Sequence, residues 1–245
     1  MYDDKQLNEI IFRYEDDYWW YVARQEIIGK FLEKHCRPGM KLLNVGSGTG
    51  ANSRFASLFA DVFSLDLSMH ALRLSRKKIQ APLICASALE IPFKSDSFDF
   101  ALGLDVIEHI KDDGQTLREI ARVLEKGKGM LLLTVPAFES MWTWRDDVAE
   151  HERRYTRKSL KGVITANGFE IVFCSYYSSL LFPAYLIDWL ADYFKNGHEK
   201  TKFFPSASEP LNSLLKRIFA FERHFLPKPG FPFGKSLICL CRTRS

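Results

Sequence analysis

The chain of 245 residues is long enough for one large domain and too short for several. With 47% hydrophobic and 26% charged residues, it has the composition of a folded protein, which excludes a disordered or collagen-like chain. Its net charge of +4 is uneven, because residues 195–245 hold 10 Lys and Arg against 3 Asp and Glu. A basic segment of this kind is either a solvated surface or a contact for an acidic partner.

The cysteines and the N-terminal segment indicate the compartment. The five cysteines are scattered and form no Cys-x-x-Cys pair, so neither a cysteine zinc site nor a disulfide framework is expected. The first ten residues are polar and acidic, which predicts no signal peptide. The apolar stretch 174–187 contains Pro183 and is too short to span a bilayer. We therefore expect a cytoplasmic protein.

Strand and helix patterns alternate along most of the chain. Buried strands typically read as short apolar runs, and helices as apolar residues three and four apart. Asp113 and Thr156 are the expected N-caps of two of the helices, and Gly168 the expected C-terminal glycine of the second. Alternation at this spacing predicts a Rossmann-like, doubly wound α/β fold. Strands are predicted at 41–45, 61–66, 82–87, 98–104, 129–136, 169–177 and 236–244, and helices at 25–35, 52–60, 69–79, 113–124 and from 156.

Residues 178–234 interrupt this alternation between the sixth and seventh strands. They contain two helix-like stretches, at 180–194 and 211–226. A compact α/β sheet does not require such a piece, so we expect a helical cap or a partner-binding insert. Alternatively, the two helices only bury each other.

The sequence Asn44-Val45-Gly46-Ser47-Gly48-Thr49-Gly50 follows the first strand and precedes a helix. Glycines allow close backbone approach to a ligand, and a helix N-terminus offers free N–H donors to an anion. Asp66 ends the next strand, where a carboxylate can accept hydrogen bonds from both ribose hydroxyls. The combination predicts a nucleoside-type cofactor. The glycine spacing alone also fits NAD, but no second mononucleotide-binding half follows.

Several segments together resemble the class I S-adenosylmethionine (SAM) dependent methyltransferases of the type 11 branch. The similar segments are the glycine loop, Ile91-Pro92-Phe93 with Ser97-Phe98-Asp99, residues 104–109 and residues 118–129. The resemblance implies a seven-stranded sheet with the last strand antiparallel and a helical insert between strands six and seven. It implies one domain over 1–245, with an N-terminal aromatic and helical segment (1–38), a SAM-binding core (39–177 and 235–245) and an insert or cap (178–234).

A narrower resemblance rests on Tyr18-Trp19-Trp20, on His151-x-Arg153-Arg154-Tyr155 and on residues 232–236. These segments are similar to a bacterial and archaeal branch associated with surface-glycan or lipid-linked biosynthesis. The acceptor implied is a small or lipid-linked molecule.

The resemblance also implies which residues contact SAM. Asn44 stands where the family usually has Asp or Glu, and Ser87 where it often has Asp, so both contacts lose a charge. The backbone N–H of Ala88 remains available to adenine. The expected cofactor-binding residues are Arg24, Asn44, Gly46, Ser47, Gly48, Gly50, Asp66, Leu67, Ser87, Ala88, Leu104 and Asp105.

Asp105, Glu108 and His109 follow the fourth strand and should face the reactive methyl group. Two carboxylates and a histidine could bind a metal. The interpretation we prefer is that Glu108 and His109 begin a helix and cap or buttress it, so no metal is predicted.

The segment His151 to Tyr155 follows the fifth strand, where this fold places substrate groups. His151 could accept a proton near neutral pH, as could His109, so both are candidate bases. Arg153 and Arg154 could hold a phosphate or carboxylate, and Tyr155 lies beside them. Alternatively, this segment is a solvated charge run.

The N-terminal aromatic residues admit two interpretations. Trp19 and Trp20 could form a flap over the cofactor, with Arg24 meeting its carboxylate, or they could anchor a helix on the sheet. An inward-pointing Arg24 would require an anionic partner.

We therefore predict an enzyme that transfers a methyl group from SAM to an acceptor, most simply on oxygen, with S-adenosylhomocysteine as product. A non-catalytic SAM-binding protein and an NAD-dependent oxidoreductase stay as alternatives. No nucleic-acid partner is expected, because the basic residues form no track and no Asn/Asp-Pro-Pro-Tyr/Phe motif follows the fourth strand. The insert combines aromatic and basic residues, which predicts peripheral contact with an anionic membrane at the inner membrane face.

Overall fold

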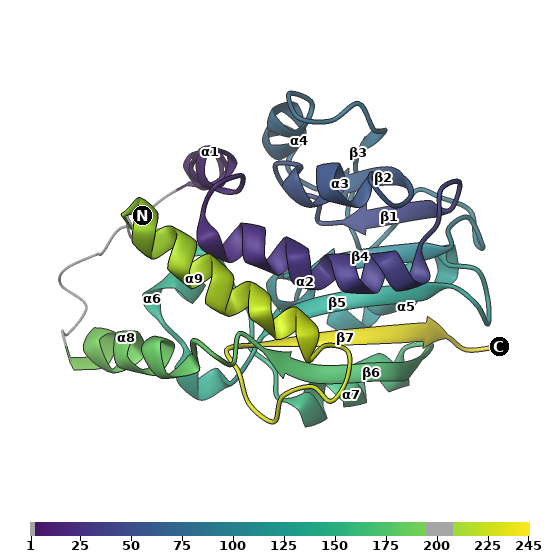
Figure 1. Ribbon diagram of the computed structural model, residues 1–245. Helices are drawn as coiled ribbons and strands as arrows, with labels where there is room; N and C mark the ends of the chain where they lie inside the picture. The colour runs from purple at the N-terminus through teal and green to yellow at the C-terminus, as the bar shows by residue number, and fades with distance from the viewer. Residues whose placement is uncertain (1–2, 195–207) are drawn as a thin grey trace.

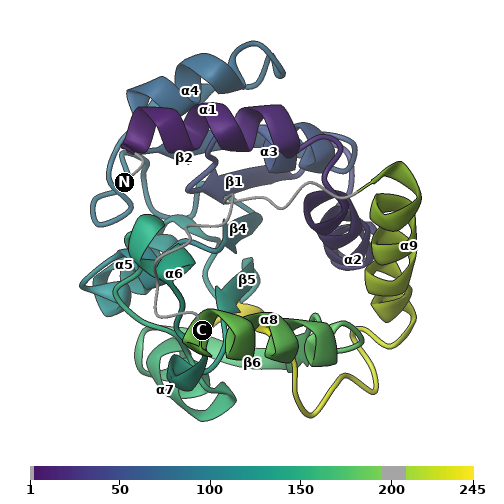
Figure 2. The same cartoon turned by 90° about the vertical axis from the view of Figure 1, so that its left-hand side faces the viewer.

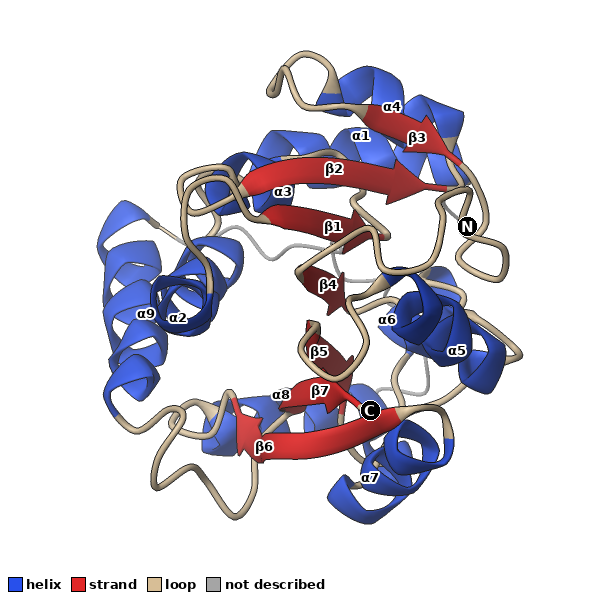
Figure 3. Ribbon diagram, turned by 90° about the vertical axis from the view of Figure 1, so that its right-hand side faces the viewer, coloured by secondary structure: helices blue, strands red, loops and turns tan. Residues whose placement is uncertain are grey.

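The computed structural model describes residues 3–194 and 208–245. In this part of the chain, seven strands form one sheet in the order β3-β2-β1-β4-β5-β7-β6 (Figure 3). Strands β1 to β5 run parallel, and β7 is antiparallel to both β5 and β6. The predicted fold is confirmed. The strands are β1 Lys41–Val45, β2 Asp61–Asp66, β3 Leu83–Cys85, β4 Phe100–Leu104, β5 Met130–Pro136, β6 Phe169–Tyr177 and β7 Ser236–Thr243.

Apolar side chains fill both faces of the sheet. Because successive strand residues point to opposite faces, Leu42 and Leu43 join different cores. Helices α2 (Trp19–His35) and α9 (Glu209–Phe221) cover one face. Helices α5 (Asp113–Val123) and α7 (Arg157–Ala166) cover the other (Figure 3). The continuous apolar runs of the strands are explained by this burial on two sides.

The caps of α5 and α7 test two sequence predictions. Asp112 is the N-cap of α5, accepting from the Gln115 N–H, so the prediction of Asp113 was wrong by one residue. Thr156 caps α7 as predicted, and Gly168 follows its end with φ of +93°. The short helices are α3 Ala51–Ala56, α4 Met69–Ser75, α6 Trp144–Val148 and the 3₁₀ helices η1 Ile107–His109, η2 Glu139–Met141 and η3 Glu222–His224.

The N-terminal segment differs from the prediction. Helix α1 (Asp4–Tyr14) was not expected; it is capped by Asp3 and lies against α4 (Figure 2). Helix α2 begins at Trp19, well before residue 25. The Trp19 ring packs against Phe219 and Tyr185, which are far away in sequence. Trp19 is therefore an anchor of α2, and periodicity could not reveal this because its partners are not local.

The insert contains α8 (Phe182–Phe194) and α9. Helix α9 packs across α2 (Figure 1). Phe219 is buried at this contact, beside Trp19 and Tyr177. The second apolar stripe of the insert thus completes the core above the sheet, and α9 packs on α2. None of the helices in the described ranges combines the length and the apolar character that crossing a bilayer requires.

Glu222 ties the end of α9 to the start of the insert. Its carboxylate is fully buried and accepts the backbone N–H groups of Ser178, Ser179 and Leu180 at 2.6–2.7 Å. Burial raises the pKa of Glu222, and these three donors oppose the rise. Ser178 has φ of +59°, so the carboxylate holds a turn that the backbone alone would not favour.

Replacing Glu222 by Ala should lower the free energy of unfolding by about 3 kcal/mol or more, because three N–H groups, two of them buried, lose their acceptor. Urea denaturation measures the loss. Glu209→Ala, at the exposed start of α9, is the control and should cost well under ~1 kcal/mol. Equal losses in the two variants would contradict the anchoring role.

Candidate functional site

The loop after β1 is shaped by glycines. Gly46 has φ of +64°, and a Cβ there would collide with the side chain of Val106. Gly48 has φ of +54°, and a Cβ there would meet nothing within 4 Å. Gly46 is therefore required by close packing against Val106, whereas the space beside the Gly48 backbone is open. This is the arrangement that close approach of a ligand needs.

Asp66, the last residue of β2, braces the loop. One carboxylate oxygen accepts the Gly48 N–H at 2.7 Å, and the other accepts the Ser68 N–H at 2.8 Å. Burial raises the pKa of Asp66 in spite of these bonds. Each carboxylate oxygen has a second lone pair, so Asp66 can still accept hydrogen bonds from ligand hydroxyls.

Two buried hydroxyl groups of the loop have no hydrogen-bond partner in the part of the chain that the structure describes. Ser47 Oγ and Thr49 Oγ1 are enclosed and make no hydrogen bond within the described residues. Buried polar atoms are normally paired, so orphaned atoms in a glycine loop fit a site that a polar ligand completes.

The residues expected near adenine lie beside Asp66. Leu67 is 74% exposed, and the chain after β3 returns to this edge through the Ala86 N–H, which donates to the Asp66 carbonyl. The Ser87 hydroxyl accepts the Leu89 N–H at 3.1 Å and so closes a local turn; Ala88 follows it. An exposed apolar side chain next to Asp66, the carboxylate that the sequence predicts to bind ribose, fits an aromatic base.

Asn44 lies under the loop. Its amide donates to Ser53 Oγ at 2.8 Å, and Ser53 is also bonded to Ser64. All three are buried. The structure therefore uses the Asn44 amide to connect β1 to α3 and β2.

Arg24 and Asp105 were expected to contact the cofactor separately, and they are paired with each other. Arg24, on α2, is buried and makes an ion pair with Asp105, directly after Leu104 at the end of β4. Thr134 donates a second hydrogen bond to Asp105 at 2.9 Å. The Arg24 guanidinium also lies 4.4 Å from the centre of the Trp20 ring. The anionic partner that Arg24 requires is supplied by the chain.

Glu108, His109 and His151 form a cluster whose ligand atoms all lie within 4.8 Å of one another. Glu108 and His109 belong to the short 3₁₀ helix η1, and the N-cap of α5 is Asp112 rather than either of them. That they buttress a helix, as the preferred sequence interpretation has it, stays a prediction. The two imidazole rings meet edge to face, with centres 4.6 Å apart. Glu108 is fully buried, and both of its carboxylate oxygens lack a partner in the described chain. Burial, followed by the charge of Asp105, raises the pKa of Glu108 well above its usual range.

Asp146 orients this cluster from α6. Its carboxylate lies 2.8 Å from His151 Nδ1 and accepts two hydrogen bonds from Arg154, at 2.7 and 2.8 Å. Burial raises the pKa of Asp146, but the bonds to His151 and Arg154 outweigh it and hold the pKa below its usual range. The His151 ring is therefore held with Nε2 directed away from Asp146.

The other basic residues of this segment are also paired within the chain. Arg153 makes an ion pair with Asp113 at 3.1 Å, and Tyr155 donates to the same carboxylate at 2.7 Å. Tyr155 is buried. Neither Arg153 nor Tyr155 forms part of the small pocket that lies nearby.

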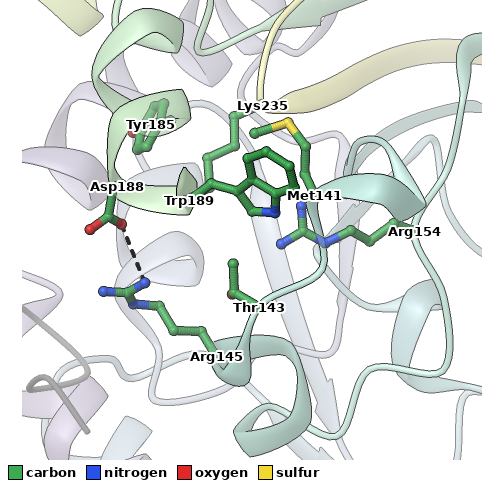
Figure 4. Close-up of a pocket in the computed structure, with 8 residues that line it drawn as sticks. All are labelled: Met141, Thr143, Arg145, Arg154, Tyr185, Asp188, Trp189 and Lys235. Carbon is green, nitrogen blue, oxygen red and sulfur yellow. Dashed lines mark hydrogen bonds and ion pairs between the residues drawn. The ribbon is translucent and has the colours of Figure 1, made fainter. Parts of the chain in front are cut away.

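That pocket lies between α8 and the segment containing η2 and α6 (Figure 4). Lys235 is half-buried, with its ammonium group 4.2 Å from the centre of the Tyr185 ring. Burial lowers its pKa to about 8. An ion pair of 3.3 Å between Arg145 and Asp188 connects the two sides. The pocket is lined by Met141, Thr143, Arg145, Arg154, Tyr185, Asp188, Trp189 and Lys235.

Sequence reasoning missed Asp146 and Lys235. Asp146 has a local signal, because Thr143-x-x-Asp146 is a capping-box pattern and the structure contains that box. Nothing local indicates its bonds to His151 and Arg154. Lys235 precedes β7, and only the position of α8 makes it part of a pocket.

Comparisons with known proteins identify relatives of this chain in sequence and in fold. Residues 43–133 match the family described as a methyltransferase domain. An uncharacterized protein of Methanocaldococcus jannaschii is 27% identical over 190 residues, which are 76% of this chain and 75% of that protein. A probable S-adenosylmethionine-dependent methyltransferase of Mycobacterium tuberculosis is 26% identical over 164 residues, or 65% of this chain and 58% of its own.

Among solved structures, a chain from the complex of the Haloferax volcanii Trm112 methyltransferase activator with a methyltransferase candidate is similar over 100% of both chains. The TM-score is 0.66 and the identity 16%. The fold is thus shared with methyltransferase structures, and the family match covers the glycine loop, Asp66 and the residues after β4.

Replacing Asp146 by Asn should lower the free energy of unfolding by about 3 kcal/mol at pH 7, because it leaves the buried Arg154 guanidinium without its counter-charge. The folded pKa of Asp146 is depressed, so its contribution is complete above the ordinary carboxyl range, about pH 4, and disappears as pH falls further.

The difference between the parent and this variant should therefore shrink only below about pH 4, as followed by denaturant titration across pH. Glu170→Gln, which removes the exposed pair with Arg242, is the control and should change stability by less than ~1 kcal/mol. A pH-independent difference would contradict the argument.

Proposed function

We propose that this protein transfers a methyl group from SAM to an oxygen of a small or lipid-linked acceptor that carries an acidic group. The observation that carries the proposal is the glycine loop braced by Asp66, with open space at Gly48 and two buried hydroxyls that need partners. The match of residues 43–133 to a methyltransferase domain supports the same conclusion.

The chain offers groups for each part of the cofactor. Asp66 would accept the ribose hydroxyls, Leu67 would lie against adenine, and Ser47 and Thr49 would donate to polar atoms of the bound molecule. Arg24, paired with Asp105, lies at the opposite end, where the cofactor's carboxylate is expected. When bound, SAM supplies a methyl group on a positively charged sulfur, which leaves readily.

The acceptor would enter from the pocket that contains Lys235 and Arg154. Half-buried cations such as these bind a carboxylate or phosphate well, and Trp189 offers an apolar wall. Arg154 also contacts Asp146, which connects the pocket to His151. An acceptor anchored by its anionic group would thus present a hydroxyl to the cluster of Glu108, His109 and His151.

In the transfer itself, the acceptor oxygen forms a bond to the methyl carbon while the carbon–sulfur bond breaks. The electron pair of that bond stays on sulfur, which gives S-adenosylhomocysteine. The acceptor proton would be released at the cluster of Glu108, His109 and His151 and pass to solvent water. The protein's main contributions are alignment and exclusion of water.

Replacing Asp66 by Ala should weaken SAM and S-adenosylhomocysteine binding by about 1.5–3 kcal/mol, because charge-assisted ribose hydrogen bonds are lost. Calorimetry measures the change. Asp66 also accepts hydrogen bonds from the Gly48 and Ser68 N–H groups, and Asp66→Asn keeps one acceptor oxygen. The SAM affinity of Asp66→Asn should therefore lie between that of the parent and that of Asp66→Ala. Asp61→Ala, at the exposed start of β2, should bind like the parent, and unchanged affinity in Asp66→Ala would exclude this cofactor site.

Replacing His151 by Ala should lower turnover by about 10²-fold or more while SAM affinity is retained, because proton removal from the acceptor depends on it. Release of S-adenosylhomocysteine is measured with a panel of hydroxyl compounds that carry a carboxylate or phosphate. His224→Ala, on the exposed part of η3, is the control. If His151→Ala and His224→Ala methylate an acceptor at the same rate, His151 is not part of the catalytic site.

We also propose that the insert contacts an anionic lipid surface. Exposed apolar residues lie on both helices: Leu186, Ile187 and Leu190 on α8, and Leu211, Leu214 and Phe221 on α9. Lys216 and Arg217 accompany them on α9, and Lys228 follows η3. Apolar side chains flanked by cations suit a negatively charged membrane. Lys195, Lys200 and Lys202, which contribute to the same charge in the sequence, lie outside the described residues.

Flotation of the full chain with vesicles containing phosphatidylserine should therefore bring it to the lipid fraction at low salt. Neutralising Lys216, Arg217 and Lys228 to Gln should weaken binding by about 10²-fold, at roughly 1 kcal/mol per basic residue. The matched control neutralises Lys126, Lys128 and Lys158, on other elements. A parent chain that stays in the aqueous fraction would contradict the lipid contact.

A further inference from the structure

The carboxylate of Glu108 has no structural explanation within the described chain. It is fully buried, and both oxygens lack a hydrogen-bond partner. Protonation would remove the charge, but it would still leave a buried O–H donor and a carbonyl oxygen unpaired. The described residues therefore contain no group that satisfies both oxygens, which fits a ligand that binds here.

The neighbouring carboxylates do not share this deficit. Asp105 is neutralised by Arg24 and accepts from Thr134, while Asp146 is neutralised by Arg154 and bonded to His151. Of these three buried or half-buried acids, Glu108 is the one without a partner in the described residues.

Two imidazoles complete a set of ligands around this carboxylate. Ligand atoms of Glu108, His109 and His151 all lie within 4.8 Å of one another. In a tetrahedral zinc site, ligand atoms that each lie about 2.1 Å from the ion are roughly 3.4 Å from one another. Side-chain rotations that move the ligand atoms by about an ångström would therefore bring all three within reach of one ion. His109 is exposed, which leaves a path for an ion to enter.

Asp146 prepares His151 for this role. Its bond to His151 Nδ1 leaves Nε2 as the ligand atom, and a carboxylate behind a histidine is the usual arrangement around a metal ion. Arg154 in turn holds Asp146 in place. The second shell of a metal site is thus already present.

We propose that Glu108, His109 and His151 bind a divalent transition-metal ion of the zinc type. One carboxylate and two imidazoles are donors for zinc and its neighbours, whereas magnesium and calcium prefer all-oxygen sets. The sequence analysis predicted no metal because it considered only Asp105, Glu108 and His109; His151 comes from a segment after β5.

The role of the ion rests on the proposed function. Three protein ligands leave a coordination position open, and an acceptor hydroxyl bound there would lose its proton to water more readily. The acceptor oxygen then attacks the methyl carbon, and the electron pair of the breaking carbon–sulfur bond remains on sulfur. His109 and His151 would act as ligands, and neither needs to retain the proton.

The test uses the full, untagged chain, freed of metal by a chelator and titrated with Zn²⁺ in a calorimeter. One equivalent should bind, and Glu108→Gln and His109→Ala should each weaken binding by about 10²-fold or more. Asp146→Asn should weaken it by about 10- to 100-fold through loss of the support to His151. His70→Ala, which removes a histidine paired with Glu9 far from the cluster in sequence, should leave it unchanged.

Cobalt substitution provides a second readout, since Co²⁺ in this site should absorb visible light and lose that absorption in Glu108→Gln. If Glu108→Gln fails to fold, the exposed His109→Ala variant decides. Absence of stoichiometric binding, or binding equal in the parent and in the folded ligand variants, would overturn the proposal. SAM affinity measured on the same metal-free samples separates this outcome from failure of the proposed function.

Discussion

A carboxylate buried away from water needs a counter-charge or donors within hydrogen-bond distance, and this constraint organises the functional edge of the molecule. Asp105 draws Arg24 from α2 across to the end of β4. Asp146 holds Arg154 and His151 together after β5. Each pair connects segments that the sheet alone would leave independent, so charge compensation determines where the side chains of the site lie.

The same constraint positions the insert. Glu222 gathers three N–H groups at the turn that begins it, and this turn leads into α8. Helix α8 carries Tyr185 and Trp189, which form one wall of the pocket above Lys235 (Figure 4). A single buried acid on η3 therefore supports the geometry of a pocket whose other wall comes from η2 and α6.

Packing connects the two halves of the site. Val106, directly after Asp105, lies against Gly46, so the glycine loop and the segment that leads to Glu108 touch. Within the described residues, hydroxyls of this loop and the carboxylate of Glu108 have no hydrogen-bond partner. Unpaired polar groups at both places indicate where ligands complete the molecule.

The sequence by itself determined those features that depend on neighbours in the chain. Apolar runs and their alternation with helices predicted the seven strands, and Asp66 was identified because it follows the glycine loop by one helix and one strand. The Thr156 cap was equally local. Helix α2 was placed too late, since Trp19 is held by Phe219 and Tyr185 rather than by a local pattern. Only the tertiary structure decided that Arg24 meets Asp105, that Lys235 lies under Tyr185, and that His151 joins Glu108 and His109. These pairings join residues far apart in the chain, and their energy comes from burial and charge compensation, which no local spacing encodes.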